Sequence, residues 1–190
     1  MKKLIVVLCA VVFYGCSHQT AKNNDLASES VIVDSTSECV GTTELAEKYK
    51  GKLIAAEDSQ LLASSLGNPQ EGKLCQGQVY LSKAPIILYR AWNSTNPGSQ
   101  FGRWWAFEKP NGKVAKYRAD YEICYQWSPL DKMSRCTLQA GIKVVIGNGQ
   151  SAKCSQYLTY PVSKAQQIYI ESANEAMVNC ETYNDEFNWQ

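Results

Sequence analysis

The chain has 190 residues, of which 45% are hydrophobic and 11% aromatic, and its 19 basic and 18 acidic side chains leave a formal net charge of +1. This composition is typical of a globular domain. A near-neutral chain without a basic run lacks the charge to bind nucleic acid through its phosphates. The one histidine, His18, lies in a polar N-terminal segment. The domain that follows therefore lacks the base of a Ser-His-Asp triad and the histidine ligand of a zinc site, and we expect no metal there.

Residues 1–15 have the pattern of a secretory signal. Lys2 and Lys3 precede an apolar run, Leu4–Gly15, that is short for spanning a bilayer. Cys16 then resembles the lipidated cysteine of bacterial lipoprotein signals, although Phe13 stands where an aliphatic residue is usual. We expect an exported lipoprotein of the outer membrane, in contact with the membrane only through this anchor. The alternative is ordinary signal cleavage nearby, which would give a secreted protein.

Residues 16–37 are rich in Ser, Asn, Thr and Asp, which predicts a polar tether. A short apolar run, Val31–Val33, interrupts this tether and is long enough to pair as a strand. The remaining residues, 38–190, are expected to form a single globular domain.

The cysteine count supports export. Cys9 lies in the signal and Cys16 is the lipidation candidate, which leaves six cysteines in the domain. An even number in an exported chain predicts three disulfides, although the sequence does not select their pairing. No CxxC pair occurs, so neither a zinc ribbon nor a thioredoxin-type redox site is indicated. The six cysteines are Cys39, Cys75, Cys124, Cys136, Cys154 and Cys180.

Along the chain, helical patterns come first and strand patterns follow. Helices are predicted over residues 42–51 and 58–66, a short helix over 114–124 and a final helix over 171–180. Strands are predicted at residues 78–81, 86–89, 104–107, 142–146 and 167–170. This order indicates an α+β fold, with helices followed by a mainly antiparallel, β-rich core stabilised by disulfides.

Two candidate site residues come from the first strands. Arg90 lies in the apolar segment Leu88–Trp92, where an unpaired charge would be costly. It either pairs with a carboxylate or points into a cleft to receive an anion. Trp104 and Trp105 are neighbours on a strand, so only one of them can face the core. The other is either covered or free to stack on a flat ring.

Two later segments are less specific. Gly147–Gly149 follows a predicted strand and would allow backbone to approach a ligand closely, although a tight turn is the more common explanation. Gln167 begins a strand pattern that would place it on one face with Tyr169 and Glu171. A glutamine at this position is usually an edge residue.

Taken in order, these segments resemble the ADP-ribosyltransferase-like fold, and in particular the NAD-cleaving domains of secreted toxins. The resemblance covers residues 79–171. It implies that Arg90 contacts the NAD diphosphate and that Gln167 takes the position of the catalytic residue. It further implies NAD-binding roles for Tyr89, Trp104, Trp105 and Arg118, with NAD as substrate and no cofactor. Members of that family usually carry Ser and Thr residues on the next strand, whereas this chain has Arg103–Ala106 there, without a hydroxyl side chain.

A glutamine can orient the ribose by hydrogen bonds but is not a general base. The resemblance therefore implies hydrolysis of NAD rather than ADP-ribosylation of a protein. Arg118 has a simpler alternative, an i,i+4 ion pair with Glu122 on an exposed helix face. The alternative for the whole chain is a non-enzymatic outer-membrane lipoprotein that binds a protein partner or a small ligand. Glycan binding by the abundant tyrosines and tryptophans is a third option.

Overall fold

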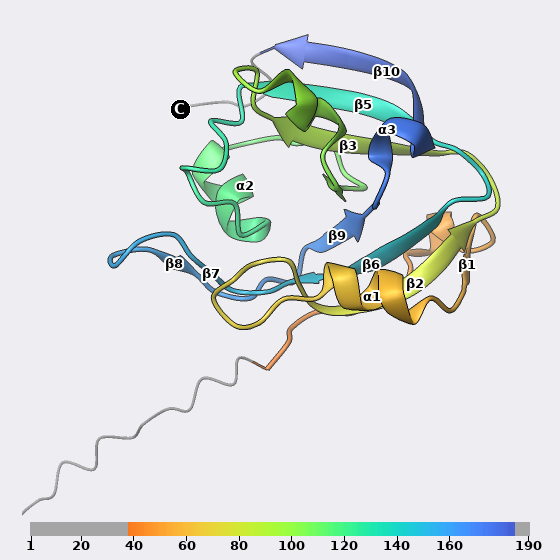
Figure 1. Ribbon diagram of the computed structural model, residues 1–190, viewed down its shortest axis with the longest axis horizontal. Helices are drawn as coiled ribbons and strands as arrows, with labels where there is room; N and C mark the ends of the chain where they lie inside the picture. Colours follow the sequence, from red (N-terminus) through yellow and green to blue (C-terminus); the bar gives the residue numbers. More distant parts are fainter. Residues whose placement is uncertain (1–37, 185–190) are drawn as a thin grey trace, which may run out of the picture. The chain divides into compact units, whose positions relative to one another are not determined.

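The computed structural model describes residues 38–184 (Figure 1). The predicted signal, Cys16, and the tether with Val31–Val33 therefore lie outside the described residues. The helices are α1 (Ser59–Ser65), α2 (Val114–Asp120) and α3 (Ala173–Ala176), with 3₁₀ turns η1 (Glu47–Tyr49) and η2 (Pro97–Phe101). The strands are β1 (Leu53–Ala55), β2 (Leu74–Ser82), β3 (Ile86–Trp92), β4 (Trp104–Trp105), β5 (Lys132–Leu138), β6 (Lys143–Gly149), β7 (Ala152–Lys153), β8 (Thr159–Tyr160), β9 (Gln166–Tyr169) and β10 (Met177–Asn184).

The strands form two antiparallel sheets and a hairpin. A five-stranded sheet has the order β1-β2-β6-β9-β4, a three-stranded sheet has the order β10-β5-β3, and β7 pairs with β8. Figure 1 shows the two sheets facing each other, with α2 beside them and the β7–β8 hairpin projecting at the same side. The predicted β-rich, antiparallel α+β architecture is confirmed. Between residues 38 and 184, no helix is long and apolar enough to cross a membrane.

The main core lies between the two sheets. Successive side chains of each strand point to opposite faces, so one set packs between the sheets and the other set packs on the outer face. In β6, Val144 and Ile146 belong to the inter-sheet core, whereas Val145 packs on the other face. In β3, Leu88 is fully buried and its neighbour Ile87 is 40% exposed. This two-residue period is the pattern of a sheet with two different faces.

Helix α1 covers the outer face of the five-stranded sheet. Asp58 caps it by accepting a hydrogen bond from the Leu61 amide at 3.0 Å. Leu61 then packs with Val145 and Tyr169 in a second apolar cluster. The helix predicted over residues 58–66 is confirmed.

Two predicted helices are wrong. Residues 42–51 contain only the single turn η1, and its flanking residue Ala46 has extended backbone angles. Residues 171–180 contain the four-residue α3, after which the chain becomes β10 and pairs with β5. The partner strand β5 was itself missed. Pairing with strands that are distant in the sequence determines the conformation of the C-terminal segment, and the local pattern of apolar residues does not predict such pairing.

All six domain cysteines are paired, so the prediction of three disulfides is confirmed. Cys39–Cys75 ties the start of the domain to β2, and Cys136–Cys180 joins β5 to β10. Cys124–Cys154 ties the loop after α2 to the β7–β8 hairpin. Three disulfides indicate an oxidising compartment, as expected for an exported protein.

Replacing Cys124 and Cys154 together by alanine is expected to lower the free energy of unfolding by about 2–4 kcal/mol. Without this cross-link the unfolded chain has more conformational entropy, which favours unfolding. Urea denaturation of both proteins without reductant measures this difference. Equal stabilities would contradict the pairing. A thiol assay on the unfolded wild-type domain, which should find no free thiol from residues 38–184, is the control.

Candidate functional site

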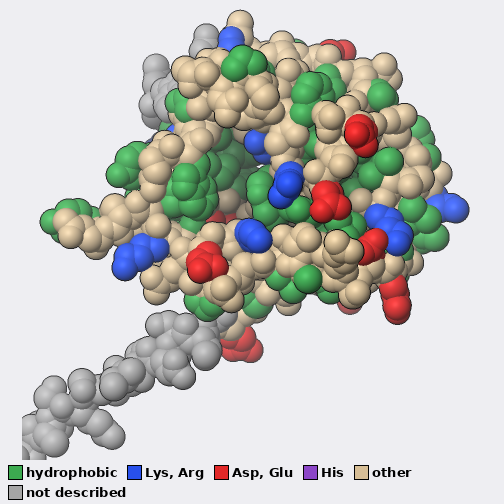
Figure 2. Space-filling view, viewed as in Figure 1, with side chains coloured by type: hydrophobic (Ala, Val, Ile, Leu, Met, Phe, Trp, Pro, Cys, Tyr) green, Lys and Arg blue, Asp and Glu red, His purple; other side chains and the backbone are tan. Residues whose placement is uncertain are grey.

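A cavity of about 210 Å³ lies where β3, β4, β9 and α2 meet the loop that follows α2. Figure 2 shows this face hollowed beside the β7–β8 hairpin, with hydrophobic side chains gathered on the walls. Four of the residues singled out in the sequence line it, namely Arg90, Trp104, Trp105 and Gln167. Tyr89 and Arg118 do not line it. The fold thus brings together residues from three strands that are separated by up to 77 positions.

Arg90 is held by backbone oxygens. Its Nε donates to the Ser99 carbonyl at 2.7 Å and its Nη1 to the Trp104 carbonyl at 2.6 Å. Gly102 makes room for the guanidinium, since a Cβ there would lie 2.1 Å from Nη2. Burial lowers the pKa of Arg90 to about 10, so the side chain stays charged at neutral pH. No carboxylate of the described residues forms an ion pair with it, which leaves a positive charge at the cavity wall.

The two neighbouring tryptophans face opposite sides, as predicted. Trp105 is 2% exposed in the inter-sheet core, and its Nε1 donates to the Gly102 carbonyl at 2.8 Å. Trp104 lies on the other face, where its ring is 5.0 Å from that of Tyr169. Both rings reach the cavity, so its wall is apolar on this side.

Gln167 lies on β9, between β6 and β4, and is therefore not an edge residue. Its Nε2 donates to Glu122 Oε2 at 2.7 Å and to the Tyr121 carbonyl at 3.4 Å. The segment Gly147–Gly149 is the end of β6, so the predicted tight turn is wrong. A Cβ at Gly149 would lie 1.7 Å from Glu122 Oε2. The glycine at this position thus provides space for the contact between Gln167 and Glu122.

Glu122 is the site residue that the sequence did not reveal. It is 2% exposed, and its Oε1 is buried without a hydrogen-bond partner among the described residues. Its backbone has φ of +48°, which is uncommon for a residue other than glycine. Burial raises the pKa of Glu122 to about 8, opposed by the Ser163 hydroxyl and the Gln167 amide and assisted by the charge of Asp120. A carboxyl group that titrates near neutrality in a cavity can exchange a proton with a ligand.

The ion pair predicted between Arg118 and Glu122 is not made. Helix α2 ends at Asp120, and the i,i+4 pair on it joins Lys116 to Asp120. Arg118 instead donates to the Ser128 carbonyl at 2.6 Å and to two other carbonyls of the same loop. Arg118 therefore shapes the loop that carries Glu122 but does not itself face the cavity.

Trp127 is a second residue that sequence reasoning missed. It lines the cavity, and it is 52% exposed. Its ring lies over Gly72, where an added Cβ would be 3.3 Å from the indole Cη2. The Cys124–Cys154 disulfide and a 2.8 Å hydrogen bond from Gln126 Nε2 to the Cys154 carbonyl hold this loop in place. The exposed Trp127 ring is therefore positioned before any ligand arrives.

The two tryptophan rings flank the contact between Glu122 and Gln167. Trp104 pairs with Tyr169, two residues along β9 from Gln167, so these three side chains share one face of the sheet. Gly72, beside the Trp127 ring, comes two residues before β2, which pairs with β6 on the side away from β9. Across the sheet order β2-β6-β9-β4, Glu122 and Gln167 thus lie between the two rings.

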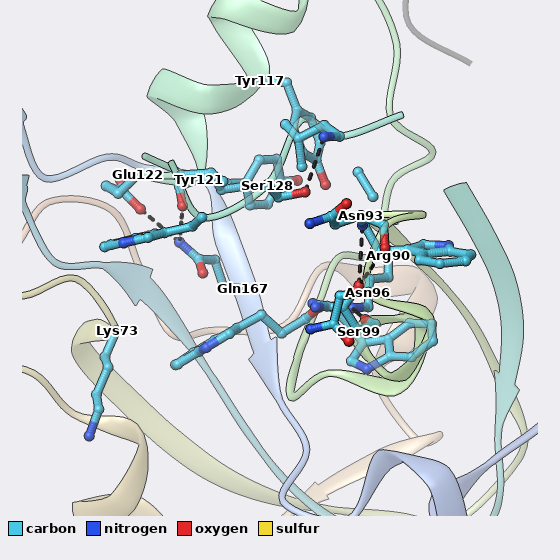
Figure 3. A pocket seen from close by; sticks show the side chains of 17 residues that line it. Lys73, Arg90, Asn93, Asn96, Ser99, Tyr117, Tyr121, Glu122, Ser128 and Gln167 are labelled. Atoms are coloured by element: carbon cyan, nitrogen blue, oxygen red, sulfur yellow. Dashed lines mark hydrogen bonds between the residues drawn. The ribbon is translucent and has the colours of Figure 1, made fainter. Parts of the chain in front are cut away.

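Figure 3 shows how the charges are distributed. Glu122 and Gln167 point toward one another in the left half of the view, and Arg90 lies to the right with Asn96 and Ser99. Lys73 lies at the lower left, below Glu122 and Gln167, and its Nζ donates to the Ser64 carbonyl at 3.2 Å. The cavity therefore has a fixed positive charge at one end and a titratable carboxyl group away from it.

Comparison with models of known protein families, with curated proteins and with solved structures found no match. The site is accordingly interpreted from the residues of this chain.

Glu122→Gln is expected to stabilise the protein at pH 8 relative to wild type and to have little effect at pH 4. An acid whose pKa is raised on folding holds its proton in the folded state while the unfolded state loses it, so stability falls as pH rises from about 4.5 to 8. The full effect is about 5 kcal/mol. Urea denaturation at several pH values measures it. A difference between the two proteins that does not change with pH would contradict a neutral, buried Glu122.

Proposed function

We propose that this chain is an exported enzyme, of the toxin or effector type, that hydrolyses NAD at the bond between nicotinamide and ribose without a metal or other cofactor. One observation carries the proposal. Arg90, Gln167 and a tryptophan, on three different strands, line the same cavity. This convergence is what the resemblance to the ADP-ribosyltransferase-like fold requires, and three separate structural roles would not require it.

The size of the cavity supports binding of one half of the dinucleotide. A volume of about 210 Å³ is smaller than the roughly 300–1,000 Å³ of pockets that enclose a drug-sized ligand. It suits nicotinamide with its ribose, while the adenosine half stays outside. Arg90 carries a charge without a carboxylate partner among the described residues and would attract the diphosphate. We assign the nicotinamide ring to the indoles of Trp104 and Trp127, because Tyr89 does not line the cavity.

The reaction needs one bond to break and one to form. The ribose C1′–nicotinamide N1 bond breaks with both electrons going to nicotinamide, which leaves as a neutral molecule. The oxygen of a water molecule bonds to C1′, and the proton of that water passes to the Glu122 carboxylate. Gln167 Nε2 donates hydrogen bonds to Glu122 Oε2 and to the Tyr121 carbonyl, while its Oε1 accepts no hydrogen bond from the described residues. That oxygen is free to accept one from a ribose hydroxyl.

One observation favours the second candidate, a non-enzymatic envelope lipoprotein that binds a partner or small ligand. Arg90 donates two hydrogen bonds to backbone carbonyls, as an arginine with a purely structural role would. In that case the cavity would bind a ligand without turnover. The two candidates differ in whether nicotinamide is released.

Incubation of the purified domain with NAD is expected to release nicotinamide. Gln167→Ala should lower kcat by about 100-fold, since the ribose and Glu122 both lose their partner. Arg90→Lys, which keeps the charge and loses the planar fork, should mainly raise KM. Gln78→Ala is the matched control, because Gln78 is a strand glutamine that bonds Ala56 and Val79 carbonyls away from the cavity. Absence of release by the folded wild type would contradict the proposed reaction.

The ratio kcat/KM is expected to rise with pH and to level off above about pH 8. The ionised form of Glu122 accepts the proton of water, and in the free enzyme its pKa is about 8. Initial rates of nicotinamide release between pH 5 and 10 test this expectation. Glu122→Gln should be slow and should lack this rise. A wild-type profile that is flat from pH 6 to 9 would contradict the assigned role.

A further inference from the structure

The space between the Trp104 and Trp127 rings has features that bear on the charge of the group it binds. It is bounded by two indoles from different parts of the chain, and Glu122 and Gln167 lie between them. Glu122 lines the cavity, and its Oε1 is buried and accepts no hydrogen bond within residues 38–184. A buried carboxylate oxygen without a donor is costly unless a ligand or a proton compensates it.

We propose that the space between Trp104 and Trp127, beside the unpaired oxygen of Glu122, is a binding site that selects a flat cationic ring, an N-substituted pyridinium. Indole faces attract cations, and the carboxylate adds an opposite charge at the ring edge. The inference deepens the proposed function by naming the charge of the bound group, and it rests on that function only for the identity of the ring.

The charges around Glu122 are consistent with this selection. Its own loop and the elements packed on it contribute the negative Asp120, the neutral Tyr121, the Ser163 hydroxyl and the Gln167 amide. None of these is a cation. The two positive side chains of the cavity are Arg90 and Lys73. In Figure 3 Arg90 lies to the right of Glu122 and Lys73 lies below it, and neither forms an ion pair with Glu122.

Binding of a cation should therefore be coupled to loss of a proton. In the empty site near pH 7 the carboxyl group is mostly neutral, because its pKa is about 8. A cation in contact with it favours the carboxylate and lowers this pKa. The proton leaves as the ligand enters. A neutral ring of the same shape, such as the dihydronicotinamide of NADH, induces no such change and binds more weakly.

A pair of small probes tests the selection without any cleavable bond. 1-Methylnicotinamide is a pyridinium cation, and nicotinamide is its neutral counterpart of nearly the same size. Tryptophan fluorescence titration of the wild-type domain at pH 9 should give a dissociation constant at least about tenfold lower for the cation. In Glu122→Gln the preference for the cation should shrink to the part that the two indoles supply, and Trp127→Ala should weaken binding of the cation.

The matched control is Tyr157→Ala, because Tyr157 is 89% exposed on the β7–β8 hairpin and does not line the cavity. It should leave both affinities unchanged. Calorimetry in buffers of different ionisation enthalpy should show release of close to one proton per bound cation at pH 7 and almost none at pH 9.5. Circular dichroism of each variant confirms that it is folded.

Equal affinity of wild type for the two probes would overturn the inference, and so would a cation preference that is as large in Glu122→Gln as in wild type. These outcomes are independent of catalysis. A folded domain that prefers the cation but releases no nicotinamide from NAD would refute the proposed reaction and leave this site intact. A domain that cleaves NAD but does not distinguish the probes would do the reverse.

Discussion

The hydrogen bond from Gln167 Nε2 to Glu122 Oε2 is the contact on which the arrangement of the site depends. It joins β9, in the middle of the five-stranded sheet, to a loop that contributes no strand to that sheet. Gly149 on the neighbouring strand leaves the space it needs, and the positive φ of Glu122 turns the side chain inward. The Cys124–Cys154 disulfide then fixes the same loop to the β7–β8 hairpin. Together these features keep one carboxyl group out of water.

Keeping that group out of water gives the cavity two unlike ends. Arg90 remains charged because a guanidinium holds its proton even when burial lowers its pKa to about 10. Glu122 responds to burial in the opposite way and becomes neutral near pH 7. The empty site is therefore positive, and it can become bipolar when a cation approaches Glu122. A ligand with a cationic ring at one end and phosphates at the other matches both ends, and this match supports the NAD proposal.

Much of the fold and half of the site could be predicted from the sequence. Short apolar, β-branched and aromatic runs marked β2, β3, β6 and β9, and an even cysteine count marked three disulfides, because both signals are local or purely compositional. Arg90 was found because a charged residue in an apolar strand is conspicuous, and Gln167 was found because the family resemblance gives it the catalytic position. Glu122 was missed because it lies in a polar stretch next to Asp120, where a carboxylate looks like ordinary surface. Only the end of α2 at Asp120 and the packing of the next loop bury it. Trp127 was missed for a related reason, since its position depends on a disulfide whose pairing the sequence does not give.

The most direct test of this account is the titration of Glu122 itself. Carbon-13 NMR of the domain labelled at the glutamate carboxyl carbons, with the Glu122 signal assigned by its absence in Glu122→Gln, reports its pKa without any assumption about substrate. The account predicts a pKa of about 8 in the empty domain and a lower value when a pyridinium cation is bound. A pKa near the ordinary value of about 4.5, or one that the cation does not change, would contradict it.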